Sequence, residues 1–180
     1  MNRLTDIFPV ALLLWLLPVS ALACPDAESG LIKLGEGKLR WFGFPIYTAS
    51  LWSETGASLQ DMYSQPVMLE LDYDRDLSKE QIIKSTREEW KRVNMVYPER
   101  EAVWLESLAN ILPNISAGDR LSSRVTPAGE TCFYLDGQKI GRVSDAKFGP
   151  AFLSIWLDSQ TRSRSLRAKL LDVLLVAEAE

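Results

Sequence analysis

Polar and apolar residues alternate in several short stretches of the chain, a pattern that predicts β-strands. The first two strands are expected within residues 38–52, KLRWFGFPIYTASLW, on either side of a turn at residues 43–45. Four more are expected at about residues 66–73, 119–126, 131–135 and 138–143. Asp136-Gly137 separates the last two strands and is a strong signal for a two-residue hairpin turn.

Between the third and fourth strands, apolar residues recur at helical spacing. Ser78 and Gln81 form a capping box, and Leu77 and Ile82 occupy the two positions of a hydrophobic staple, so a helix should begin at Ser78. The residues expected on its buried face are Ile82, Ile83, Thr86, Trp90 and Val93.

Three further helices are expected. The first covers about residues 99–112 and ends at Pro113. Its expected buried stripe is Trp104, Leu105, Leu108 and Ile111. A short helix opens at residues 147–150, and a last one covers about residues 163–176. Strands grouped around central helices, with helices closing the chain, predict an α+β domain whose helices cover one face of a largely antiparallel sheet.

The first hairpin carries the clearest candidate chemistry. A three-residue loop would place Phe42 opposite Ile46 and Arg40 opposite Thr48, so that one guanidinium and one hydroxyl sit together among apolar residues. Such a patch suits a small anionic or carbonyl-bearing apolar ligand. A two-residue loop would break this pairing, because a slip of one residue sends Thr48 to the opposite face. The alternative interpretation is an arginine on a solvated face.

Residues 1–23 resemble a signal peptide, so the domain is expected to span residues 24–180. Arg3 supplies a positive start, an apolar run follows, and Ala21-Leu22-Ala23 fits a peptidase site before Cys24. Cysteine at that position also permits lipidation, although Ala21 stands where a lipoprotein signal usually has leucine. We therefore expect a periplasmic or secreted protein, and no later stretch reaches the ~20 apolar residues of a membrane span.

Composition excludes several classes of function. The net charge of −4 argues against a nucleic-acid partner, which requires a clustered basic face. Histidine is absent, which excludes Ser-His-Asp and Cys-His nucleophile systems and the His-based zinc motifs. The alternating acids at residues 72–76 fail the EF-hand pattern, because leucine and isoleucine stand where it requires glycine and glutamate. No cofactor or metal is expected.

Cys24 and Cys132 are the only cysteines, so in an oxidising compartment we expect one disulfide between them.

Several quoted segments together resemble the chalcone isomerase-like superfamily, most closely its exported bacterial branch. The resemblance covers nearly all of residues 24–180 and rests on the order of the motifs. They are Gly37-x-x-Arg40, residues 46–52, residues 71–78, Gly118-Asp119, Phe133-Tyr134-x-Asp136-Gly137 and residues 152–157. The resemblance implies an open-faced β-sandwich, a curved antiparallel sheet with a layer of helices on one face and a ligand cleft between them.

The same resemblance supplies expectations for individual residues. Arg40 and Thr48 match the arginine that holds the phenolate of a chalcone and the threonine that helps to polarise its ketone. The family's catalytic tyrosine, asparagine and Thr/Ser fall at Leu77, Lys84 and Ile155, with Trp156 following. Two polar groups are therefore retained and three are lost. The retained pair, Arg40 and Thr48, is the part that the resemblance shares with the family's fatty-acid-binding members, in which the arginine and its neighbours hold a carboxylate.

These residues favour binding over catalysis. The expected ligand site contains Arg40, Thr48, Phe42, Ile46, Leu77, Ile155 and Trp156. The expected ligand is small and amphipathic, either fatty-acid-like or phenolic, because a cleft that holds an arginine needs an anion. The alternatives are an isomerase or lyase acting on an unsaturated carbonyl compound, and an envelope protein that binds a partner. The oligomeric state is left open.

Overall fold

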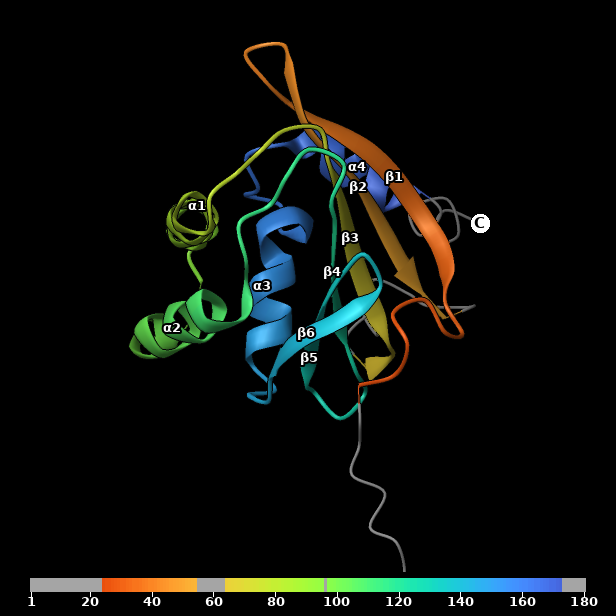
Figure 1. The fold of residues 1–180 in the computed structure, drawn as a ribbon, viewed down its shortest axis with the longest axis vertical. Helices are drawn as coiled ribbons and strands as arrows, with labels where there is room; N and C mark the ends of the chain where they lie inside the picture. The colour runs from red at the N-terminus through yellow and green to blue at the C-terminus, as the bar shows by residue number, and fades with distance from the viewer. Residues whose placement is uncertain (1–23, 55–63, 96, 173–180) are drawn as a thin grey trace, which may run out of the picture.

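The computed structural model describes residues 24–54, 64–95 and 97–172, which form one sheet and a layer of helices (Figure 1). The sheet is antiparallel throughout, and its strands follow one another in chain order. Its strands are β1 (Ile32–Trp41), β2 (Phe44–Ser53), β3 (Val67–Tyr73), β4 (Arg120–Val125), β5 (Thr131–Leu135) and β6 (Gln138–Val143). The expected α+β class with an antiparallel sheet is confirmed.

The helices follow the sequence pattern closely. They are α1 (Lys79–Arg92), the 3₁₀ helix η2 (Pro98–Arg100), α2 (Glu101–Ile111), α3 (Phe148–Leu157) and α4 (Arg164–Leu170). The expected capping box of α1 is present, because Ser78 accepts from the Gln81 backbone and the Gln81 side chain accepts from Ser78. The expected signal peptide and residues 173–176 of the last expected helix lie outside the described residues.

The main core lies between the sheet and α3, with α1 and α2 to one side and α4 along β1 (Figure 1). Phe148 and Phe152 of α3 stack with ring centroids 5.4 Å apart, and both meet Phe133 of β5 edge-on. Trp90 and Trp104 are 1% exposed and pack against each other and against Phe148. These tryptophans are therefore core residues, as their helical spacing predicts.

The opposite, outer face of the sheet is covered by the segment that precedes β1. Cys24 is bonded to Cys132 of β5, with their Cα atoms 5.9 Å apart, which confirms the expected disulfide. Arg124 donates hydrogen bonds to the Asp26 and Ala27 carbonyls at 2.7 and 3.0 Å. A small second core forms beneath this segment from Ala27, Met68, Cys132 and Tyr134, with Cys24, Leu31 and Trp52 at its margin.

Glu70 is buried on this outer face, and we expect it to make stability depend on pH. Desolvation raises the pKa of Glu70, and the neighbouring Arg120 only partly opposes the rise. The folded protein therefore holds this proton more tightly than the unfolded chain does. This group's contribution is most favourable below its unfolded pKa of ~4.3, and it declines as the pH rises through the folded value.

In a Glu70→Gln variant, the fall in stability with rising pH that Glu70 causes should disappear. The variant should be at least as stable as wild type at neutral pH. Urea unfolding between acidic and neutral pH measures the difference. Glu99→Gln, at an exposed position on η2, is the matched control and should retain the wild-type profile. A decline of the same size in Glu70→Gln would show that another group causes it.

The first hairpin differs from the three-residue loop. Trp41 pairs with Phe44, so the turn consists of Phe42 and Gly43 alone, with φ angles of 49° and 83°. Two positive φ angles are typical of the two-residue turn whose twist matches the strands. Arg40 pairs with Pro45 and Thr48 pairs with Lys38, because a register shift falls between Leu39 and Arg40. Arg40 and Thr48 are therefore not opposed, and the two-residue alternative is the one that forms.

Candidate functional site

The structure does not bring Arg40 and Thr48 into the interior. Arg40 is exposed, and its Nη1 donates to the Gly43 carbonyl of its own turn at 3.1 Å. Thr48 pairs with Lys38 and Asp72, and strand alternation places it on the face opposite its neighbour Tyr47, which packs against the main core. The polar patch expected from the hairpin is thus absent between sheet and helices, because the register shift changes the pairing.

The other expected site residues divide into two groups. Phe42 is 86% exposed at the turn, and Ile46 is half-buried beside the register shift. Leu77, Ile155 and Trp156 instead belong to the main core or pack against it. Only this second group lies between the sheet and the helices.

A buried polar pair joins β2 to α3 at the same place. Trp156 donates from Nε1 to the Tyr47 hydroxyl at 2.9 Å, and the Tyr47 ring meets the Tyr73 ring edge-on at 5.6 Å. Burial raises the pKa of Tyr47, the hydrogen bond from Trp156 lowers it, and the charge of Glu89 raises it further. Tyr47 is therefore a neutral phenol at physiological pH, able to donate a hydrogen bond but unsuited to act as a base.

Glu89 of α1 is the centre of an ion cluster near this pair. Its Oε1 lies 2.6 Å from Nη2 of Arg162, in the connection between α3 and α4. Its Oε2 lies 3.3 Å from Nε of Arg92, at an angle outside that of a hydrogen bond. The Arg162 guanidinium also lies over the Trp41 ring, 5.0 Å from its centroid. Among the described residues, Glu89 is the ion-pair partner of both arginines, so the cluster carries one surplus positive charge.

No local pattern in the sequence marks Tyr47, Glu89 or Arg162 as a site residue. Tyr47 lies next to the expected Thr48, and only the register decides which of the two faces inward. Glu89 and Arg162 meet across two helices and a loop, and no local pattern signals such a contact. A neutral phenol and a surplus guanidinium beside an aromatic core can bind an anionic or carbonyl oxygen, while the indole N–H of Trp156 is already donated to Tyr47.

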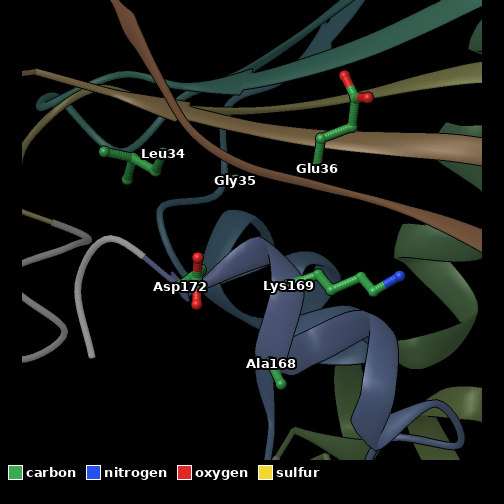
Figure 2. A pocket seen from close by; sticks show the side chains of 6 residues that line it. All are labelled: Leu34, Gly35, Glu36, Ala168, Lys169 and Asp172. Atoms are coloured by element: carbon green, nitrogen blue, oxygen red, sulfur yellow. The ribbon is translucent and has the colours of Figure 1, made fainter. Parts of the chain in front are cut away.

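A hollow of about 300 Å³ separates β1 from α4 (Figure 2). Its lining residues are Leu34, Gly35, Glu36, Ala168, Lys169 and Asp172. Beside it, Gly35 lets α4 approach β1 closely, because a Cβ there would lie 2.2 Å from the Lys169 carbonyl oxygen. Glu36 is held on the outer face by Ser50 and Lys33. The hollow is therefore a gap at the contact between β1 and α4, and its lining residues do not direct polar groups towards a common ligand.

Two general features of the described residues bear on function. Within residues 24–54, 64–95 and 97–172, no three His, Cys, Asp or Glu side chains are grouped as metal ligands would be. Over the same ranges, no helix has the length and apolar character that crossing a membrane requires.

An antiparallel open sheet with one helical layer, and polar groups between the two, defines an α+β open-faced sandwich. The chain belongs to the chalcone isomerase-like family, whose profile matches residues 31–172. This confirms the superfamily that the sequence motifs resemble.

Two comparisons give the range of similarity. A protein of Haemophilus influenzae described as uncharacterized is 26% identical over 138 residues, which are 77% of this chain and 66% of that protein. This chain thus spans slightly under two thirds of that relative's length. The crystal structure of an Arabidopsis thaliana fatty-acid binding protein superimposes with a TM-score of 0.68 and 11% identity. It covers 84% of this chain and 92% of its own, which shows that the two proteins share a fold.

Proposed function

We propose that this protein binds a small amphipathic ligand with an anionic head group, without acting on it chemically. The observation that carries the proposal is the ion cluster of Arg92, Glu89 and Arg162 beside the Tyr47 hydroxyl, at the edge of the apolar core. The fatty-acid binding protein of the same fold supports the class of ligand.

The charges of the cluster favour an anion. Glu89 neutralises one of the two arginines, and an incoming carboxylate would neutralise the other. Arg162 is the better placed, because its guanidinium is partly exposed while its contacts with Glu89 and Trp41 hold it in position. A planar guanidinium can bind two carboxylate oxygens at once, which lysine cannot do. The Tyr47 hydroxyl offers a neutral donor nearby.

The apolar part of the ligand would lie along the margin of the main core. Leu39, Leu77, Ile82 and Ile83 are half-buried there and pack against the fully buried residues. Contact with an alkyl chain would remove their remaining apolar surface from water, at about 25 cal/mol per Å². Leu77 and Ile155, which occupy positions of lost catalytic groups in the resemblance, thus contribute apolar surface to the same region.

We also propose that this protein is exported from the cytoplasm. Residues 1–23 have the features of a cleavable signal peptide, and a disulfide is stable in an oxidising compartment. A periplasmic or secreted carrier of an amphipathic molecule fits both observations.

A titration with two ligands of equal chain length tests the proposal. Dodecanoate should bind wild type, and Arg162→Ala should weaken binding about tenfold or more, because a charge-assisted hydrogen bond contributes roughly 1.5–3 kcal/mol. Arg162→Lys should recover only part of the affinity. 1-Dodecanol should bind weakly, and neither substitution should change its affinity much.

Arg40→Ala is the matched control for this titration. It removes an arginine that lies on the outer face and is bound to its own turn, so dodecanoate affinity should stay at the wild-type value. Circular dichroism checks that every variant is folded. Loss of affinity in Arg40→Ala but not in Arg162→Ala would place the head group at the hairpin instead, and equal affinity in all variants would contradict both sites.

A further inference from the structure

The tip of the β1–β2 hairpin concentrates exposed apolar surface. Five large apolar residues are exposed among those described, and three lie at this tip: Trp41 at 47%, Phe42 at 86% and Phe44 at 70%. The hairpin extends beyond the helices and the rest of the sheet, so its turn forms a narrow projection (Figure 1). An apolar group of this kind, in contrast to scattered single residues, indicates an interaction surface.

Neither the turn nor the core accounts for Phe42. Its φ angle of 49° lies in the left-handed region, where Asn, Asp and Gly are common and a bulky residue is unfavourable. Its ring contacts Trp41 edge-on at 5.1 Å and is otherwise turned to solvent. A phenylalanine that is both strained and exposed is most simply explained by a partner that takes up its side chain.

The charge of the hairpin differs from that of the whole chain. Residues 37–53 contain Lys38 and Arg40 but no Asp or Glu, whereas the net charge of the chain is −4. Lys38 is paired with Asp74 at the base of the hairpin. Arg40 donates one N–H to the Gly43 carbonyl and retains others, so the cation nearest the tip is available to an anionic group.

We propose that this tip docks the protein on an anionic phospholipid surface, with Trp41, Phe42 and Phe44 entering the headgroup region and Arg40 contacting phosphate. Trp and other aromatic rings partition to this region of a bilayer, and basic residues beside them add attraction to anionic lipids. This docking does not depend on the ligand proposed above.

The shape of the tip favours a bilayer over a protein partner. A stable protein interface buries about 800 Å² on each side, which a two-residue turn with its flanking residues does not provide. A projecting apolar tip needs no matching pocket when it enters a fluid interface. A lipid surface uses the exposed aromatic rings and the nearby guanidinium together.

Flotation with vesicles tests this proposal. The protein is produced from its full sequence and purified as the cell processes it, and mass spectrometry defines its N-terminus. Vesicles of phosphatidylethanolamine and phosphatidylglycerol should carry it upward more strongly than vesicles of phosphatidylcholine alone. The partition of the double variant Phe42→Ser, Phe44→Ser onto these vesicles should be lower by about tenfold or more, since each aromatic ring buried in the bilayer contributes substantially to the binding free energy.

Val103→Ser is the matched control, because Val103 is exposed at 64% on α2, away from the tip. It should bind vesicles as wild type does. Brominated lipids should quench part of the wild-type tryptophan fluorescence, and Trp41→Phe should abolish that part. Thermal unfolding checks that the variants are folded. Equal partition of wild type and the double variant, or no vesicle binding by wild type, would overturn the proposal, as would tip-dependent self-association without vesicle binding.

Discussion

A Cys24→Ser, Cys132→Ser double variant should lose up to about 4.7 kcal/mol of the free energy of unfolding, the largest effect expected on stability. The disulfide closes a loop with a sequence separation of 108 residues, and the chain-entropy account assigns about 4.7 kcal/mol to a loop near 100 residues. That figure is an upper value, because measured gains are often smaller. The bond also holds the segment that covers Met68 and Tyr134 on the outer face.

Urea unfolding with and without reductant measures this loss. Reductant should destabilise wild type and leave the double variant unchanged. The hydrogen bonds from Arg124 and Tyr134 to the segment after Cys24 remain in the variant, so its fold should persist. Equal stability of oxidised and reduced wild type would show that these non-covalent contacts alone hold the segment.

The second large effect is expected in catalysis: this protein should not convert a 2′-hydroxychalcone to a single flavanone enantiomer. The positions that resemble the family's catalytic tyrosine, asparagine and Thr/Ser are Leu77, Lys84 and Ile155. Thr48 lies on the outer face of the sheet, and Lys84 is exposed. Loss of even one positioned transition-state donor can lower a rate by about 10²–10³.

Stopped assays with chiral separation of the product decide this point. The expected product is racemic and forms at the spontaneous rate. Stereoselective flavanone well above that rate would contradict the prediction. Tyr47→Phe is then the informative variant, because Tyr47 is a buried neutral donor beside Trp156.

Local patterns predicted the elements well, for identifiable reasons. The capping box at Ser78 and the Asp136-Gly137 turn each involve residues close in the chain, and both form as expected. The strands and helices of the core follow from period-2 and helical spacing of apolar residues. The 3₁₀ turn before α2 replaces the first residues of the expected second helix, because Pro98 starts a tighter turn there.

The first hairpin shows where local patterns fail. Phe42 adopts a positive φ that its residue type does not signal, so the turn lies one residue earlier than Gly43-Phe44-Pro45 suggests. That difference and the register shift leave Arg40 and Thr48 facing outward. The candidate site then depends on contacts over long sequence distances, such as Glu89 with Arg162 and Tyr47 with Trp156. The sequence alone contains no spacing rule for such contacts.

The most direct test of ligand binding at Arg162 is ¹³C NMR of carboxyl-labelled dodecanoate in the presence of the protein. We expect a separate bound resonance whose titration midpoint lies below that of the free acid, because ion pairing and hydrogen bonding favour the charged form. Arg162→Ala should remove this resonance or return its midpoint towards the free value, while Arg40→Ala should leave it unchanged. A single free resonance at excess protein, or a bound resonance indifferent to Arg162→Ala, would contradict the account.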